Sequence, residues 1–165
     1  MGEDKLLMRL PNGELLVERP AGALASVCGT CCSVRRAQAP AFVPEGFEDL
    51  LDVEPGGGPL AGVVSAVKHA RTPWVLVVGG DMPALDGRFL RAFMDLAERE
   101  PHFALMVGGR RLEPLPLALP MALANEVIQR FQLGERTLRR AVPASRLRLA
   151  EPHQLPVHGE RAPWL

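Results

Sequence analysis

The sequence predicts an α/β protein built as a three-layer α/β/α sandwich around a mostly parallel sheet. Apolar runs of strand length alternate along the chain with segments of helical periodicity, which is the pattern of that class. The runs at 74–79 and 103–107 lack strict alternation of apolar and polar residues, as is typical of strands covered on both faces. We therefore expect helices on both sides of the sheet.

The first third of the chain contains turn signals and short elements. Asn12-Gly13 is a strong signal for a two-residue hairpin turn. Helical spacing follows over 15–24, but Pro20 lies inside it, so we expect a helix that is short or kinked. The apolar stretch 25–34 predicts a buried strand.

The middle of the chain has clearer signals for a strand, two helices and the strand between them. Residues 50–52 indicate the end of a strand, and a helix is expected to begin at Pro59, because the first helical turn tolerates proline. The strand 74–79 follows, and Asp86 is a suitable cap for the next helix. The apolar residues that should face the core are Leu60, Val63, Val64 and Val67 in the first helix and Phe89, Leu90, Phe93, Leu96 and Ala97 in the second.

The last third is expected to complete the sheet. After the strand 103–107 comes a proline-rich extended stretch, 113–120. A helix should then run from about 121 to 132, with Gly134 as its stop signal. A short helix at 137–141 and a strand at 147–149 follow.

Length and composition limit the class of function. The length of 165 residues fits one domain with its own hydrophobic core. Nineteen basic and nineteen acidic side chains cancel, so the chain has no electrostatic footprint for nucleic acid. No apolar run approaches the roughly 20 residues that a membrane span needs. We expect a cytoplasmic protein that binds neither nucleic acid nor membranes.

The cysteines, Cys28, Cys31 and Cys32, lie within one short stretch. A Cys-x-x-Cys pair can be half of a zinc site or a redox pair, but the sequence has no second pair of ligands at matching spacing. We therefore interpret the three residues as small apolar side chains of a buried strand.

Asp81 follows the strand 74–79, at the end where ligands bind in open parallel sheets. A carboxylate beside a buried strand is costly unless it is paired or coordinates a cation. Mg²⁺ suits such a position, because it takes one or two protein carboxylates and completes its shell with phosphate oxygens and water. The alternative is a turn in which Asp81 bonds to its own backbone.

EPGGGPLAG, residues 54–62, places a glycine loop, residues 54–58, just ahead of the helix that begins at Pro59. Gly57 and Gly58 can expose amides beside a helix N-terminus, which suits an anion or a closely approaching ligand. The loop lacks the spacing of a Walker or dinucleotide-binding motif, and an ordinary strand-to-helix turn is the alternative. Asp52 ends the preceding strand, so two strand-end carboxylates would flank one crevice.

Three motifs occur in the order found in one family. MGEDKLL, residues 1–7, resembles the end of the nucleotidyltransferase signature Leu-Ala-Gly-Gly-x-Ser-x-Arg-Met-Gly-x-Asp-Lys. GGGPLAG, residues 56–62, resembles the central loop, and VVGGDMPAL, residues 77–85, resembles the metal-binding strand end. Together with LGERTLRRAV, residues 133–142, they are similar to the molybdenum cofactor guanylyltransferases over residues 1 to about 150.

This resemblance implies a Rossmann-like sheet of the nucleotide-diphospho-sugar transferase type and transfer of GMP from GTP to molybdenum-molybdopterin, with release of pyrophosphate. Lys5 and Asp81 would be the catalytic residues, and Asp81 would hold Mg²⁺. Such a displacement needs charge neutralisation more than a covalent nucleophile, so a metal, a lysine and backbone amides suffice. By itself, Lys5 would be an ordinary surface charge. The residues expected in the nucleotide pocket are Lys5, Asp52, Gly57, Gly58, Pro59 and Asp81.

The resemblance also sets expectations about the ends of the chain and its partners. The family signature has a Gly-Gly phosphate loop and a strand before Met-Gly, and an Asn-x-Asn-Thr-Pro segment beyond the Arg-Ala-Pro-Trp-Leu that closes this sequence. We therefore expect a single nucleotidyltransferase-like domain, residues 1–165, that is incomplete at both ends. A molybdoenzyme chaperone or acceptor protein would receive the finished cofactor.

The sequence is also compatible with three alternatives. A cytidylyltransferase or another NTP transferase would carry the same motifs, because base choice depends on residues outside them. A catalytically inactive binding or assembly paralogue would keep the fold without the phosphate loop. An unstable fragment would lack cooperative unfolding.

Overall fold

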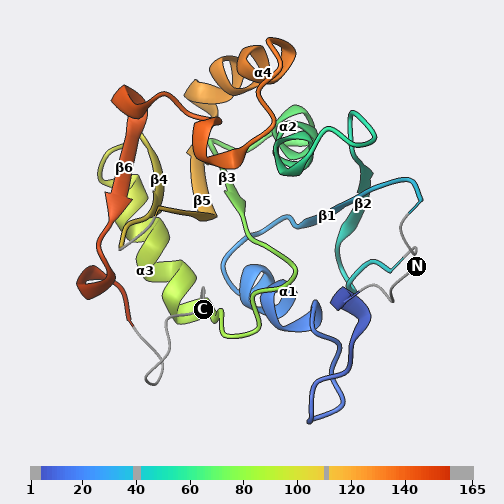
Figure 1. Ribbon diagram of the computed structural model, residues 1–165. Coiled ribbons are helices and arrows are strands. Elements are labelled where there is room, and N and C mark those ends of the chain that lie inside the picture. Colours follow the sequence, from blue (N-terminus) through green and yellow to red (C-terminus); the bar gives the residue numbers. More distant parts are fainter. Residues whose placement is uncertain (1–4, 39–41, 110–111, 157–165) are drawn as a thin grey trace.

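In the computed structural model, which describes residues 5–38, 42–109 and 112–156, the strands form two sheets (Figure 1). β1 and β2 form a parallel pair, and the second sheet has the order β3-β5-β4-β6. β5 is antiparallel to both of its neighbours, whereas β4 and β6 are parallel. The sheet is therefore mixed, and the prediction of a mostly parallel sheet is wrong. The strands are β1 (Cys32–Arg35), β2 (Glu48–Leu51), β3 (Trp74–Val77), β4 (Ala104–Val107), β5 (Glu113–Pro120) and β6 (Leu147–Ala150).

β5 is the strand that the sequence pattern showed only as a proline-rich stretch. Residues 108–112 connect it to β4, and so short a connection allows only an antiparallel neighbour, because parallel strands need a long crossover. Ala118 pairs with Leu105 of β4, and the next pair is Glu113 with Val107. Pro116 lies in the irregular stretch between these two pairs, where a residue without an N–H is tolerated.

Helices cover both faces of the four-stranded sheet and give the three layers of the expected sandwich (Figure 1). One hydrophobic core lies between this sheet and helices α2 and α4, and the other between the sheet and helices α1 and α3. A 3₁₀ turn, Lys5–Leu7, precedes them. The helices are α1 (Glu18–Ala25), α2 (Pro59–His69), α3 (Gly87–Glu98) and α4 (Ala124–Gln132), with further 3₁₀ turns at Met121–Leu123, Leu138–Arg140, Ala144–Arg146 and Pro152–Gln154.

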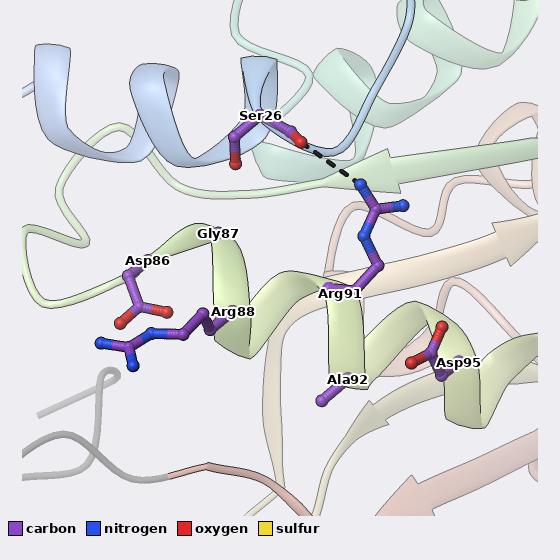
Figure 2. Close-up of a pocket in the computed structure, with 7 residues that line it drawn as sticks. All are labelled: Ser26, Asp86, Gly87, Arg88, Arg91, Ala92 and Asp95. Atoms are coloured by element: carbon purple, nitrogen blue, oxygen red, sulfur yellow. Dashed lines mark hydrogen bonds between the residues drawn. The ribbon is translucent and has the colours of Figure 1, made fainter.

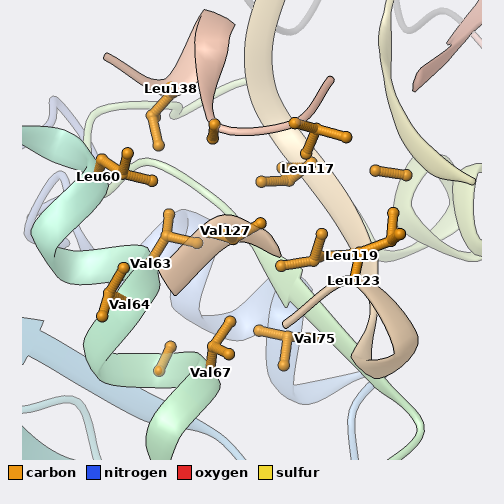
Figure 3. Close-up of a cluster of buried hydrophobic side chains, with 14 of the residues drawn as sticks. Leu60, Val63, Val64, Val67, Val75, Leu117, Leu119, Leu123, Val127 and Leu138 are labelled. Carbon is orange, nitrogen blue, oxygen red and sulfur yellow. The ribbon is translucent and has the colours of Figure 1, made fainter. Parts of the chain in front are cut away.

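Alternate residues of the central strands enter opposite cores. Leu117 and Leu119 of β5 lie in the core with α2, whereas Ala118 between them lies in the core with α3. Figure 3 shows the first core, in which the apolar side chains of α2 point toward those of β3 and β5. All three β5 residues are fully buried, which explains their unbroken apolar run.

The local helix signals of the sequence are confirmed. Pro59 is the first residue of α2. Asp86 caps α3, because its Oδ1 accepts a hydrogen bond from the Phe89 amide at 2.8 Å. Gly134 follows α4 with φ 98°, the left-handed conformation that ends many helices. The apolar stripe of α3 is buried as expected except for the half-buried Leu96.

The prediction of a strand over 25–34 is largely wrong. Helix α1 continues to Ala25, a turn follows, and the strand begins only at Cys32. Pro20 does not prevent this short helix, because it lies in the first turn, where backbone amides have no partner within the helix. A hairpin turn does include Asn12-Gly13, with an isolated antiparallel bridge between Arg9 and Leu15, but the predicted two-residue loop is wrong: the Leu10 amide donates to Glu14 O at 2.8 Å, so the loop has three residues, 11–13.

Residues 1–4, at the start of the motif MGEDKLL, and residues 157–165, with the Arg-Ala-Pro-Trp-Leu end, lie outside the described part of the chain. No described helix is long and apolar enough to cross a membrane.

Candidate functional site

The structure brings Lys5 and Asp81 together. Lys5 Nζ donates a hydrogen bond to Asp81 Oδ2 at 2.7 Å, and both side chains are exposed. This ion pair connects the first 3₁₀ turn to the loop that follows β3. The hydrogen bond and the negative charge of Asp81 raise the pKa of Lys5, so the lysine is a stable cation at neutral pH.

Gly80 allows the first 3₁₀ turn to approach the loop after β3, and Gly79 leaves room for the Asp81 carboxylate. A Cβ atom on Gly80 would lie 3.1 Å from Leu6 Cδ2, and one on Gly79 would lie 3.0 Å from Asp81 Oδ1. The Gly79 amide donates to Met82 Sδ at 3.3 Å, which fixes the turn around Asp81. Among the described residues, the Asp81 carboxylate bonds to Lys5 and to no backbone amide, unlike the turn considered as the alternative.

The glycine loop forms a second part of the predicted site. Gly58 precedes α2 with φ 71°, a conformation that favours glycine. Gly57 is buried, and a Cβ atom there would lie only 2.9 Å from Ala61 Cβ. No described side chain caps the amides of α2, which begins at Pro59. The Gly57 amide donates to the Glu54 carbonyl at 3.0 Å and Pro59 has no N–H, so of the predicted contacts Gly58 is the one whose amide can donate to phosphate.

Asp52 lies between β2 and the glycine loop. Its amide donates to the Arg35 carbonyl at 2.9 Å, which extends the β1–β2 pairing by one step. Its Oδ1 lies 3.5 Å from the position that a Cβ atom on Gly62 would occupy, so the carboxylate rests against α2. Burial raises the pKa of Asp52, and the positive charge of Arg36 partly opposes this.

Two residues that sequence reasoning did not single out hold the glycine loop in place. Ser65 is buried in α2, where its Oγ donates to Ala61 O at 3.0 Å and accepts from the Val53 amide at 2.9 Å. Arg136 Nη2 lies 3.1 Å from Glu54 Oε1. A lone serine within the apolar stripe of a helix was the available signal for the first, and the likeness in LGERTLRRAV was the signal for the second.

The predicted residues thus fall into two groups. Lys5 and Asp81 form one group, and Asp52, the glycine loop and Pro59 form the other. No hydrogen bond or ion pair within the described part of the chain joins the two groups. A bound ligand would have to reach both groups if they belong to one site.

Mg²⁺ fits the donor set only together with a ligand. No cluster of three or more His, Cys, Asp or Glu side chains among the described residues could hold a metal ion. Asp81 supplies a single exposed carboxylate. That is sufficient for Mg²⁺ when phosphate oxygens and water fill its remaining positions.

A surface pocket of about 610 Å³ lies elsewhere, beside the N-terminus of α3 (Figure 2). Arg91 Nη2 donates to the Ser26 carbonyl across it at 3.3 Å. None of the predicted site residues lines this pocket, and its two aspartates offset its two arginines. It therefore gives no support to the predicted nucleotide site.

The cysteines match their interpretation as apolar side chains only in part. Cys31 is buried, whereas Cys28 and Cys32 are half-buried, and all three are free thiols. Burial raises the pKa of each, so they remain protonated at neutral pH. Only Cys32 belongs to a strand, because Cys28 lies in the turn after α1.

Solved structures share the fold of this chain. Molybdopterin-guanine dinucleotide biosynthesis protein A from Archaeoglobus fulgidus superposes with a TM-score of 0.74 at 21% identity, over 93% of this chain and 77% of that one. The 2-C-methyl-D-erythritol 4-phosphate cytidylyltransferase from Thermus thermophilus gives a TM-score of 0.62 at 18% identity, over 94% and 88%. At these identities the likeness establishes the fold alone, as that of nucleotidyltransferases.

Sequence comparison identifies the family. A probable molybdenum cofactor guanylyltransferase from Opitutus terrae is 34% identical over 150 residues, which cover 87% of this chain and 72% of that protein. The molybdenum cofactor guanylyltransferase of Pseudomonas syringae is 38% identical over 86 residues, and the match covers 43% of its length. The profile of the MobA-like NTP transferase domain matches residues 1–149. The chain therefore belongs to the family of MobA-like NTP transferase domains.

Proposed function

We propose that this protein is a nucleotidyltransferase that moves GMP from GTP to molybdenum-molybdopterin. The observation that carries the proposal is the Lys5–Asp81 ion pair at the carboxyl end of β3, in a chain whose relatives are named molybdenum cofactor guanylyltransferases. The uncapped N-terminus of α2 behind the glycine loop supports it as a second place for phosphate.

The reaction is a displacement at the α-phosphorus of GTP. A phosphate oxygen of molybdopterin attacks, a new P–O bond forms, and the bond between the α-phosphorus and the bridging oxygen breaks. The electron pair of that bond leaves with pyrophosphate. The product is the guanine dinucleotide form of the cofactor.

The side chains of this protein would neutralise and position charge during that displacement. Lys5 carries a cation on a flexible stem, so it can contact the phosphates and offset the charge that develops on the leaving pyrophosphate. The Gly58 amide would donate to phosphate oxygens, Gly57 and Pro59 would shape the loop around the nucleotide, and Asp52 would line the nucleotide pocket. Asp81 would hold Mg²⁺, which supplies Lewis-acid stabilisation of the phosphates when bound.

Calorimetric titration tests this proposal directly. The full chain is titrated with GTP and with CTP, each with and without Mg²⁺, and the titration is repeated with Asp81→Asn. Asp95→Asn serves as the matched control, because Asp95 is an exposed carboxylate on α3 outside the predicted site. Release of pyrophosphate is then measured with GTP and molybdenum-molybdopterin as substrates.

The outcomes separate the candidate functions. Mg²⁺-dependent binding of GTP that Asp81→Asn abolishes and Asp95→Asn preserves supports the guanylyltransferase. Preference for CTP would assign a cytidylyltransferase instead. Binding without pyrophosphate release would indicate an inactive binding or assembly paralogue, and no nucleotide binding by a cooperatively folded chain contradicts the proposal.

A further inference from the structure

The glycine loop is held from outside by the segment that follows α4. Glu54 opens the loop and Gly58 closes it, and Arg136 contacts both of these residues. Arg136 is 82 positions away from Glu54 in the sequence. The conformation of a loop with three consecutive glycines is thus tied to a side chain of a distant helix end.

The end of α4 aims Arg136 at the loop. Gly134 turns the chain out of the helix, with hydrogen bonds from its own amide to Phe131 O at 3.0 Å and from the Glu135 amide to Arg130 O at 3.0 Å. The Glu135 carboxylate then accepts from the Arg136 amide at 2.9 Å. These hydrogen bonds fix the backbone around Arg136 independently of the contacts of its side chain.

The guanidinium of Arg136 is fixed on the helix side as well. It lies over the ring of Phe131, 4.3 Å from the centroid. Its Nη1 donates to Phe131 O at 2.7 Å and to Glu135 O at 2.9 Å. Its Nη2 remains directed at Glu54, with distances of 3.1 Å and 3.4 Å to the two carboxylate oxygens. Since each arm of the guanidinium has a separate partner, the side chain joins the helix end to the loop.

The backbone makes the second contact. A Cβ atom on Gly58 would lie 3.1 Å from the Arg136 carbonyl oxygen, so the loop passes directly against this residue. Gly58 adopts φ 71° there. Glycine loses more conformational freedom on ordering than any other residue, so a glycine loop needs contacts of this kind to keep one conformation.

We propose that Arg136 is a positioning residue that sets the conformation of the glycine loop and thereby the affinity of the site for its nucleotide. The inference rests on the proposed function for the identity of the ligand. Arg136 acts through Glu54 and Gly58, whose neighbour Gly57 is a predicted nucleotide contact. A loop that already has its bound conformation binds its ligand more tightly, because less conformational entropy is lost on binding.

The first measurement needs no ligand. Hydrogen–deuterium exchange of the free full-length chain is compared for the wild type, Arg136→Ala, Arg136→Lys and Glu54→Gln. Arg148→Ala is the matched control, because Arg148 also lies over an aromatic ring, that of Phe103 at 3.5 Å, and pairs with Glu100 at 2.8 Å. Arg136→Ala should speed exchange of the amides at 54–58, and Arg148→Ala should leave them unchanged.

The second measurement is the affinity for GTP in the presence of Mg²⁺. We expect Arg136→Ala to weaken GTP binding about tenfold, because binding would then have to order the glycine loop and would cost more conformational entropy. Arg136→Lys and Glu54→Gln, which keep more of the local packing, should lie between it and the wild type. Melting temperatures are recorded for every variant, so that a loss of stability alone is recognised.

The two measurements have distinct meanings. Faster exchange confined to the loop, with weaker GTP binding, supports the proposal. Unchanged exchange at 54–58 overturns it, as does unchanged GTP affinity in an Arg136→Ala chain whose loop exchanges faster. If the wild type binds no nucleotide while the loop still responds to Arg136, the proposed function fails and the positioning of the loop by Arg136 is supported.

Discussion

Lys5 Nζ and Asp81 Oδ2 lie 2.7 Å apart, although 76 positions separate the two residues in the sequence. The Asp81 carboxylate is therefore already paired with a cation when no ligand is bound. A metal ion that binds Asp81 has to compete with Lys5, and a lysine released from the carboxylate becomes available to phosphate. Binding of the two ligands would be favoured together over binding of either alone.

Lys5→Met should weaken Mg²⁺-dependent binding of GTP about tenfold or more, because a charged hydrogen bond to phosphate is lost. The melting temperature should change little, since ion pairs between exposed side chains contribute little to stability. Calorimetry and thermal unfolding measure the two quantities. Lys5→Arg, which keeps the charge, is the control, and wild-type GTP affinity in Lys5→Met would exclude a phosphate contact.

Asp52→Asn should raise the melting temperature at pH 7 while weakening GTP binding. Burial raises the pKa of Asp52 above its ordinary value of 3.8, so its charged form destabilises the folded state at neutral pH. The substitution removes that cost. The difference from the wild type should vanish below pH 3.8, where the carboxyl is protonated in both the folded and unfolded states. The measurement is thermal unfolding of both proteins at pH 7 and below pH 3.8. A melting temperature of Asp52→Asn below that of the wild type at pH 7 would contradict the reasoning.

Gly58→Ala should destabilise the protein more than Gly13→Ala. Both glycines have positive φ, at 71° and 88°, so substitution should cost about 1 kcal/mol of backbone strain at Gly13 and about 1–3 kcal/mol at Gly58, whose ψ of −173° completes a conformation that essentially only glycine adopts. A Cβ atom at Gly13 meets nothing within 4 Å, whereas one at Gly58 lies 3.1 Å from the Arg136 carbonyl. We expect this contact to add about 1 kcal/mol in urea unfolding. Equal losses of unfolding free energy for the two variants would show that the loop moves away from the added Cβ atom at no cost.

Ser65→Ala should cost about 1 kcal/mol of unfolding free energy, because the Val53 amide loses its hydrogen-bond acceptor. The control is Ser26→Ala at the exposed end of α1, where the hydroxyl donates, among the described residues, to the Ala23 carbonyl alone. That change should stay within about 0.5 kcal/mol. Denaturant unfolding of both variants gives the comparison, and a cost for Ser65→Ala no larger than for Ser26→Ala would contradict a role in holding the loop.

The sequence predicted best those features that depend on neighbouring residues. Pro59 at the first position of α2 and Asp86 at the cap of α3 depend on backbone chemistry within one helical turn, and both are confirmed. The prediction of a strand over 25–34 was largely wrong, because an apolar run does not distinguish a buried helix end from a strand. The alternation of β5 between two cores was hidden by its prolines, which the shifted pairing with β4 accommodates.

The site shows the same division. Asp81 at a strand end and the glycine loop before α2 could be predicted from local pattern, and their catalytic and nucleotide-binding roles stay predictions. The contact between Arg136 and Glu54 could not be predicted from local pattern, because only the tertiary fold brings the end of α4 to the end of β2. Ser65 has a local clue, but its partner at Val53 is set by how α2 packs against β2.

Helix α2 is the element that both sheets share. In the described part of the chain, the β1–β2 pair has no strand pairing with the larger sheet, and α2 packs against β1, β2 and β3. β2 is mostly exposed, whereas β4 is fully buried, so the smaller sheet should open more readily than the larger one. The glycine loop joins β2 to α2 and thus lies on the boundary between a weak and a strong cooperative unit. A nucleotide bound at the loop would contact both units and would bind only when both are folded. Its binding energy would therefore suppress the partial opening of the smaller sheet as well as global unfolding.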